Sequence, residues 1–554
     1  MLIGLLTIVL CLPALFGGLA MDDHVLARAV EEGQPAWDLF RFVDPTTRGP
    51  RTAEGMFGWW AAPDLEIEFW RPLSSVWHWV DVRVWGRAWP MYLESVLLYA
   101  ALVMLVGVVY RRWLGSGAAV GWATVVFAVD DTHAQTIGWI ANRNLVLATS
   151  LGFAALLAHD RWRRDGWRPG AVLGPMLLVA ALASAEAGLA VCGYLFAHAL
   201  CLDDARWRRR LLALSPYVAV AIVWRLVYVG LGYGVVASGM YRDPGLDPLG
   251  VLVDAFQRIG VMAFGQLTLP ISSPLHAMPR GWWWALAGLT LLGWWLWPLL
   301  KRDRVARFFA VGMLMTAAPF ATTVPSGRVL LPLGLGAAGL VAQVVTAAAT
   351  ADERDPWRPR WLARGALLLH VWISLLLFVP SLLMVRLIDG DTRALSAAVV
   401  GTATEAPVAV VVNVPLDVLL LHPSSIAKRA GEPWPSRVVP LYAGRGTVSL
   451  ERVDDHSVQL RATAGWMASP INRFARAADR PMAVGERVVS PEVVVHVQKV
   501  NGAGRPTQIL ATFARRLDEV AWVAWVDGTP VAWPVPAVHS RYTLATEFSF
   551  MPSW

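Results

Sequence analysis

The chain is divided into long apolar blocks, most of them about as long as a helix that crosses a bilayer. Such a helix needs roughly 20 residues, because the hydrocarbon core is about 30 Å thick. Of the 554 residues, 56% are hydrophobic and 16% are charged, whereas about 25% of the residues in a soluble globular protein are charged. This composition excludes a simple cytosolic enzyme, a disordered chain and a fibrous repeat, and it predicts a polytopic membrane protein.

The apolar blocks predict a mainly α-helical fold with about eleven membrane-spanning helices. The predicted spans are residues 2–20, 90–110, 114–130, 144–159, 170–185, 187–202, 211–232, 282–300, 306–324, 329–348 and 365–387. We expect the first span to remain as a membrane anchor, and a cleaved signal peptide is the alternative. Segment 249–270 is apolar but contains Asp254 and Arg258. We expect an interfacial or re-entrant helix there, because a further span would invert all later loops.

Clusters of basic residues fall between these spans, and with eleven spans they all lie on one side. Lys and Arg in short loops mark the cytoplasmic side, so loops 21–89 and 233–281 and everything after about residue 388 are expected to face outward. Lysine is rare among the 48 basic residues, which suggests a GC-rich bacterial genome and hence a bacterial inner membrane. The clusters are Arg111–Arg112; Arg161, Arg163, Arg164 and Arg168; Arg206 and Arg208–Arg210; Lys301, Arg302, Arg304 and Arg307; and Arg354, Arg358, Arg360 and Arg364.

The C-terminal part of the chain has short β-rich runs in place of long apolar blocks. Turn sequences such as Asn501-Gly502 and Asp527-Gly528 separate the runs, as is typical of strands joined by tight turns. We therefore predict a transmembrane domain over residues 1–390 and an extracytoplasmic β-domain, of the sandwich or jelly-roll type, over 391–554. The runs are Ala406–Val414, Ser457–Ala464, Glu492–Val500, Thr507–Phe513 and Val520–Val526.

Two adjacent carboxylates, Asp22 and Asp23, directly follow the first span. Ionisable residues at the ends of spans often bind or catalyse, because a charge near the bilayer is costly; the alternative is that the pair ends a helix and faces water. Three more charged residues are predicted on the same side of the membrane. Arg71 is in the first outer loop, Glu186 is in the tight turn between the fifth and sixth spans, and Arg328 lies between the ninth and tenth spans.

Asp130, Asp131 and His133 lie at the outer end of the third span, and Arg143 opens the fourth. Arginine binds phosphate bidentately, and carboxylates accept hydrogen bonds from sugar hydroxyls, so a site for a sugar phosphate is indicated. Asp130 and Asp131 can also provide hard oxygen ligands for Mg²⁺ or Mn²⁺, and a divalent metal is left open. The alternatives are that His133 is structural and that Glu186 only pairs with an arginine.

Several segments resemble motifs of the GT-C superfamily of membrane glycosyltransferases, most nearly those of bacterial relatives of the transmembrane O-mannosyltransferases. Asp22-Asp23 is similar in position to the catalytic acid that the superfamily keeps in its first outer loop. The resemblance covers roughly residues 1–350, with the motifs in the right order. The other segments are Trp70–Ser74, Phe127–Val129, Gly138–Arg143, Ser184–Glu186 and Gly327–Pro332.

The resemblance implies transfer of a sugar from a polyprenyl-phosphate donor to the hydroxyl of a glycan, lipid or protein acceptor, with inversion. Asp22 or Asp23 would act as the general base, and the choice between them stays open. Arg328 would stabilise the leaving phosphate, with Arg71 and Arg143 as second candidates. Membrane lipids are the expected surroundings, and no nucleic-acid partner is expected.

The sequence also departs from the superfamily's motifs. The segment Asp130–Gln135 keeps one of two expected histidines, and Ala185 replaces a lysine. These departures favour a second hypothesis, a non-catalytic relative that binds a lipid-linked saccharide or glycan. A transporter is disfavoured because the sequence has no visible inverted repeat.

Overall fold

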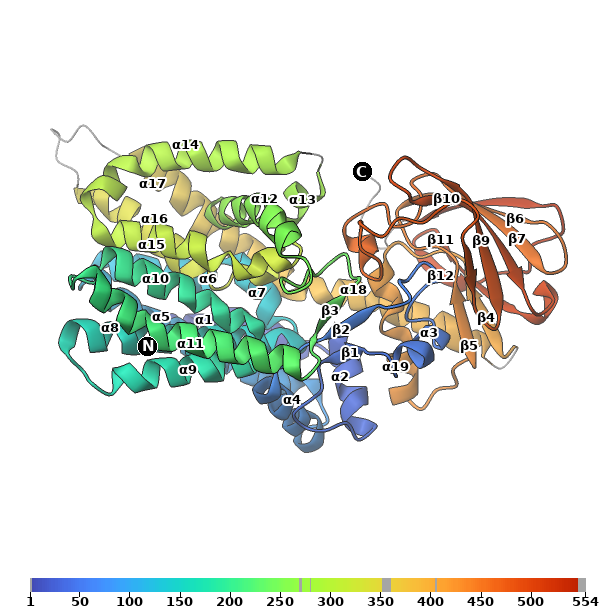
Figure 1. Ribbon diagram of the computed structural model, residues 1–554, viewed down its shortest axis with the longest axis horizontal. Coiled ribbons are helices and arrows are strands. Elements are labelled where there is room, and N and C mark those ends of the chain that lie inside the picture. Colours follow the sequence, from blue (N-terminus) through green and yellow to red (C-terminus); the bar gives the residue numbers. More distant parts are fainter. Residues whose placement is uncertain (1, 269–271, 279, 351–359, 404–405, 547–554) are drawn as a thin grey trace.

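The computed structural model describes residues 2–268, 272–278, 280–350, 360–403 and 406–546. The predicted basic residues Arg354 and Arg358 lie outside these ranges. Figure 1 shows two parts side by side along the long axis, a helical part and a β-rich part, with helix α18 (Ser374–Thr402) reaching from one to the other.

Within the described ranges, six helical segments are long and apolar enough to cross a membrane. They are Ala88–Leu114 (α5), Ile140–Asp165 (ending in α8, Arg143–Asp165), Trp207–Gly230 (α11), Gly281–Arg302 (α14), Arg304–Thr322 (beginning with α15, Arg304–Thr316) and Arg360–Thr402 (α17, Arg360–Leu367, through α18). Five shorter apolar helices are Leu2–Phe16 (beginning with α1, Leu2–Cys11), Ala118–Val129 (α6), Gly170–Ser184 (α9), Glu186–Cys201 (ending in α10, Val191–Cys201) and Gly334–Thr350 (α16). Each predicted span thus corresponds to an apolar helix, and the number that cross the bilayer remains a prediction.

The segment predicted to be interfacial or re-entrant forms helix α12 (Pro248–Leu267). Its two charged side chains pair with each other, since an Arg258 Nη2 atom lies 2.8 Å from an Asp254 oxygen. Arg258 also donates to the carbonyls of Ala321 and Thr323. A buried charge needs such partners, and α12 is not among the candidate spans found in the described residues.

The basic loops gather at one end of the helical part, which we call the basic end. Arg112 Nε lies 2.5 Å from an Asp160 oxygen, and Arg163 Nε lies 2.8 Å from an Asp203 oxygen. These ion pairs join residues that are 48 and 40 positions apart in sequence. The prediction that the clusters share one side agrees with this grouping, while their cytoplasmic placement stays a prediction.

The opposite end, which we call the loop end, brings the loop over residues 21–89 and the loop after α11 together. Strands β1 (Arg41–Val43), β2 (Glu66–Glu68) and β3 (Gly234–Val236) form one sheet in the order β1-β2-β3, and β2 pairs with β3 in an antiparallel register. Short helices complete the loop end: α2 (Asp22–Glu31), α3 (Arg48–Ala53), α4 (Pro72–Val84), α7 (Asp131–Ile137) and α13 (Ser272–Ala277). The two loops predicted to share the outer side therefore do lie together.

The β-rich part contains a six-stranded sheet, in the order β13-β6-β7-β10-β9-β8, and a four-stranded sheet, in the order β12-β11-β4-β5. Apolar residues of both sheets belong to one buried cluster. The strands are β4 (Val408–Val411), β5 (Arg437–Pro440), β6 (Gly446–Arg452), β7 (Ser457–Ala462), β8 (Arg487–Val489), β9 (Val493–Val500), β10 (Pro506–Phe513), β11 (Ala521–Val526), β12 (Thr529–Ala532) and β13 (Arg541–Thr546). All five predicted runs contain a strand.

Two features of the β-rich part differ from the prediction. Strand β4 pairs in parallel with both β5 and β11, which a jelly roll of antiparallel strands does not do. Parallel neighbours need a crossover connection, and helix α19 (Pro423–Arg429) lies in the segment between β4 and β5. The predicted domain boundary at residue 390 falls inside α18, which is continuous from Ser374 to Thr402.

Candidate active site

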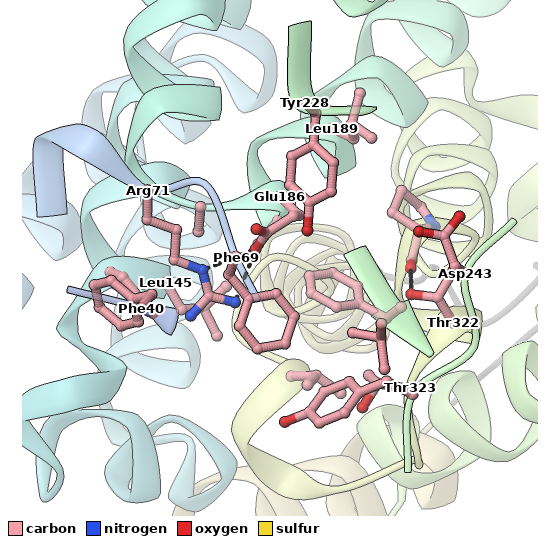
Figure 2. A pocket seen from close by; sticks show the side chains of 18 of the residues that line it. Phe40, Phe69, Arg71, Leu145, Glu186, Leu189, Tyr228, Asp243, Thr322 and Thr323 are labelled. Carbon is pink, nitrogen blue, oxygen red and sulfur yellow. Dashed lines mark hydrogen bonds and ion pairs between the residues drawn. The ribbon is translucent and has the colours of Figure 1, made fainter. Parts of the chain in front are cut away.

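A cavity of about 390 Å³ opens at the loop end, between the loops of that end and the ends of the helices. Figure 2 shows part of its lining, in which charged and aromatic side chains face one another. Among the predicted residues, four from distant parts of the chain line this cavity: Asp22, Arg71, Glu186 and Arg328. The sequence prediction that acids and arginines gather in one hollow is therefore met for these four residues.

Arg71 and Glu186 form an ion pair in the cavity wall. The Arg71 Nη2 and Glu186 Oε2 atoms are 2.8 Å apart, and the guanidinium carbon lies 4.4 Å from the ring centre of Phe69 and 5.0 Å from that of Phe40. Arg71 immediately precedes Pro72, whose fixed φ suits the first position of α4. This pair can offer both donors and acceptors to the hydroxyls of a sugar.

Arg328 is held differently from the other arginines of the cavity. An Arg328 Nη2 atom lies 3.3 Å from the Tyr241 hydroxyl oxygen, and its guanidinium carbon is 5.5 Å from the Trp139 ring centre. Arg225 pairs with Asp243, and Arg242 pairs with Asp247 and Asp254. Arg328 forms no ion pair with a carboxylate of the described residues, so its charge is available to an anionic ligand.

The two adjacent aspartates have different surroundings. Asp22 lines the cavity, with 29% of its side chain exposed, and its Oδ1 atom lies 3.0 Å from His422 Nε2. Asp23 is 4% exposed, and its oxygens accept hydrogen bonds from the backbone N–H groups of Ala20 and Ala141 at 3.0 and 2.7 Å. Burial raises the pKa of Asp23 to about 8. Asp22 is therefore the aspartate that can meet a ligand, while Asp23 ties the first loop to the segment that follows α7.

Arg143, predicted as a second phosphate ligand, is outside the cavity lining. Its guanidinium nitrogens lie 2.5 Å from an Asp81 oxygen and 2.7 Å from a Glu94 oxygen, and its charged group also lies over the ring of Trp77. Two carboxylates already compensate this buried cation. The arrangement suits a residue that locks α4 against α5 and α8 rather than one that binds a ligand.

The predicted residues Asp130, Asp131 and His133 form part of a buried network and are also outside the lining. Asp130 caps α7 by accepting from Thr132 N–H, and its other oxygen lies 2.6 Å from Gln266 Nε2. His133 Nδ1 lies 3.0 Å from the Phe127 carbonyl oxygen. Within the part of the chain that the structure describes, no group of three or more His, Cys, Asp or Glu residues could hold a metal ion.

Sequence reasoning missed His422, which comes from the C-terminal part and contacts Asp22. A smaller cavity of about 50 Å³ is lined by Asp22, His422 and Phe474, among other residues. Asp22 and Tyr241 line both cavities. The dipeptide His422-Pro423 carries no motif, so only the three-dimensional fold reveals its place.

No family model and no curated protein sequence matches this chain. The solved structures to which the chain is similar include the following two. ArnT from Cupriavidus metallidurans, bound to undecaprenyl phosphate, is 16% identical over 79% of this chain and 88% of that chain, with a TM-score of 0.37. The Archaeoglobus fulgidus oligosaccharyltransferase, tethered to an acceptor peptide, is 11% identical over 80% of this chain, with a TM-score of 0.40. This chain spans 63% of the oligosaccharyltransferase chain.

Proposed function

We propose that this protein is a membrane glycosyltransferase that moves a sugar from a polyprenyl-phosphate donor to an acceptor hydroxyl. The observation that carries the proposal is the presence, in one cavity, of a partly exposed carboxylate, Asp22, and a guanidinium group, Arg328, that lacks a carboxylate partner among the described residues. Asp22 is also one of the charges that act on Arg328 electrostatically. A base and a phosphate ligand are thus both present where a sugar would lie.

The donor phosphate binds at Arg328 and the Tyr241 hydroxyl, because a guanidinium group donates two parallel hydrogen bonds to phosphate oxygens. The same cavity has an apolar side, which includes Leu189, Trp224 and Phe320. This side accepts the first units of the prenyl chain. A ligand with a charged head and an apolar tail therefore fits the cavity better than a free sugar nucleotide does.

The chemistry is a direct displacement with inversion. Asp22 accepts the proton of the acceptor hydroxyl as its oxygen forms a bond to the anomeric carbon. The bond between the anomeric carbon and the phosphate oxygen breaks, and polyprenyl phosphate leaves with the electron pair. Arg328 stabilises the negative charge that develops on that oxygen. The ion pair of Arg71 and Glu186 orients the sugar through its hydroxyls.

The reaction takes place at the loop end, which we assign to the extracytoplasmic face of a bacterial inner membrane. The basic end then faces the cytoplasm, as the excess of arginine in its short loops favours. The acceptor is a glycan, lipid or protein of the cell envelope. The proton transfer by Asp22 needs no cofactor. A divalent metal would have to bind together with the donor.

The proposal is tested with the purified full chain in lipid nanodiscs. Radiolabelled undecaprenyl-phosphate hexoses are incubated with lipid, glycan and protein fractions of a bacterial envelope, and the transfer of label is measured. Asp22→Asn should reduce the rate roughly 100- to 10,000-fold, the range for loss of a general base. Asp165→Asn, which changes an exposed carboxylate at the basic end, is the control.

Full activity of Asp22→Asn would overturn the role of this carboxylate. Binding of undecaprenyl-phosphate hexose without any turnover would instead support the second hypothesis, a non-catalytic protein that binds a lipid-linked saccharide.

A further inference from the structure

His422 reaches the candidate active site from a part of the chain 400 residues away from Asp22. Its Nε2 atom lies 3.0 Å from Asp22 Oδ1, and its side chain is 1% exposed. His422 and Asp22 also both line the small cavity. The β-rich part of the molecule therefore supplies a direct neighbour of the proposed base.

Local structure fixes the direction of the His422 side chain. His422 is the N-cap residue of α19, and Pro423 occupies the first position of that helix, where its fixed φ is favourable. The Ser396 hydroxyl on α18 donates to the Pro423 carbonyl oxygen at 2.9 Å. Because α18 holds the start of α19 and the His422 side chain is buried, the imidazole ring has little freedom to turn away from Asp22.

The hydrogen-bond partners of His422 also indicate its tautomer. Its Nδ1 atom is buried and has no partner among the residues that the structure describes. A proton on Nδ1 would be a buried donor without an acceptor, which costs more than an unused lone pair. The proton therefore belongs on Nε2, which donates to Asp22 Oδ1.

We propose that His422 is a positioning residue that fixes the Asp22 carboxylate in the orientation needed for proton transfer. The Nε2–H group occupies Oδ1 and leaves Oδ2 for the acceptor hydroxyl. His422 does not exchange a proton with the acceptor in this arrangement, because the tautomer that its surroundings favour already carries the proton on the nitrogen that faces Asp22. This inference rests on the proposed function, and it makes the β-rich part a component of the active site.

Two substitutions that differ by one methylene group test the proposal. In His422→Gln the amide nitrogen can reach nearly the place of Nε2, whereas in His422→Asn it lies near the place of Nδ1 and cannot reach Asp22. We expect His422→Asn to lower kcat roughly 10- to 100-fold, the cost of losing a hydrogen bond to a charged group. The KM for undecaprenyl-phosphate hexose should change by less than about threefold in both variants, and His422→Gln should recover most of kcat.

His198 offers a matched control at the basic end. It is a buried histidine whose Nε2 lies 2.9 Å from Asp160 Oδ1, and its Nδ1 also has no partner within the described part of the chain. The Gln and Asn variants of His198 should lower thermal stability in the same way as those of His422. The kcat of the folded protein should be the same in the Gln and Asn variants of His198, because no substrate group is near this residue.

The outcomes separate this inference from the proposed function. Absence of transfer by the unsubstituted protein would overturn the proposed function itself, and full activity of Asp22→Asn would overturn the base role of Asp22 on which this inference rests. An inactive Asp22→Asn protein, together with equal kcat values for His422→Gln and His422→Asn, would overturn only the positioning role. If neither variant yields folded protein, His422→Ala is assayed with added imidazole. Recovery of kcat by imidazole supports the role, and no recovery overturns it.

Discussion

Single residues at the start of α2 have roles set by their surroundings rather than by their type. Asp22 and Asp23 are identical side chains one position apart, yet one faces a cavity and the other is enclosed by backbone donors. Sequence alone predicted the pair and left the choice open, because adjacent residues on a helix point in different directions and the surrounding segments decide which direction is buried. The partner of Asp23, Ala141, is 118 residues away.

The raised pKa of Asp23 predicts a specific dependence of stability on pH. The pKa is about 8 in the folded protein and has its ordinary value of 3.8 when unfolded, so between these values the folded state holds a proton that the unfolded state has lost. Stability contributed by this group is full below about pH 4 and falls as pH rises towards 8, with a slope of at most about 1.4 kcal/mol per pH unit. The stability of Asp23→Asn, measured by thermal unfolding at several pH values, should lack this part of the pH dependence. Identical pH profiles for the two proteins would contradict the assignment.

Arg328 is expected to determine the affinity for the lipid phosphate. Arg328→Gln should weaken binding of undecaprenyl phosphate roughly 10- to 100-fold, because a charged hydrogen bond to phosphate is lost. Titration in nanodiscs, followed by native mass spectrometry, measures the change. Arg225→Gln is the control, since Arg225 is already paired with Asp243, and we expect a smaller effect. An equal loss in both variants would contradict a specific phosphate site at Arg328.

At the scale of elements, the apolar helices and five strand-containing runs were predictable from hydropathy and turn sequences, but the elements that connect the parts were not. Helix α18 was predicted to end near residue 387, and it continues to Thr402. Asp389 in this extension accepts from Met21 N–H at 3.0 Å and lies 3.1 Å from His24 Nε2. Met21 has φ of 53°, a conformation that non-glycine residues rarely adopt. Long-range contacts of this kind leave no periodic signal in the sequence.

The close contact between α7 and α18 makes Gly138 sensitive to substitution. A Cβ atom at Gly138 would lie 2.0 Å from the carbonyl oxygen of Leu382 in α18. Because backbone cannot yield as a side-chain end can, Gly138→Ala should destabilise the protein by about 1–3 kcal/mol. Gly121→Ala in α6 is the matched control, since a Cβ there meets nothing within 4 Å, and it should be neutral or slightly stabilising. Thermal unfolding measures both, and equal stability of the two variants would contradict this packing.

At the scale of the whole molecule, the distribution of charge predicted which loops lie together. The basic loops meet at one end, and the loop over residues 21–89, the loop after α11 and the β-rich part meet at the other. The hollow lined by Asp22, Arg71, Glu186 and Arg328 was also predictable, because the order of the motifs placed these residues on one side. The parallel strands differ from the jelly roll that we predicted, and His422 was missed. Both depend on crossovers within the β-rich part that no local pattern specifies.

The sidedness of the molecule can be measured with single cysteines. Arg168→Cys places a thiol in an exposed basic loop, and Lys499→Cys places one on the exposed surface of β9. In intact bacterial cells, a membrane-impermeant maleimide should label the Lys499→Cys protein and leave the Arg168→Cys protein unlabelled until the cells are opened. The native cysteines are buried or half-buried, and the unsubstituted protein gives the background. The reverse pattern would contradict the proposed orientation.

The contact between Asp22 and His422 also bears on how the protein is made. The aspartate leaves the ribosome near the beginning of synthesis, and its histidine neighbour follows 400 residues later. The contact between Asp22 and His422 can therefore form only after most of the chain has been synthesised. A chain that ends before His422 would keep Asp22, Arg71, Glu186 and Arg328, but it would lack the neighbour that contacts Asp22.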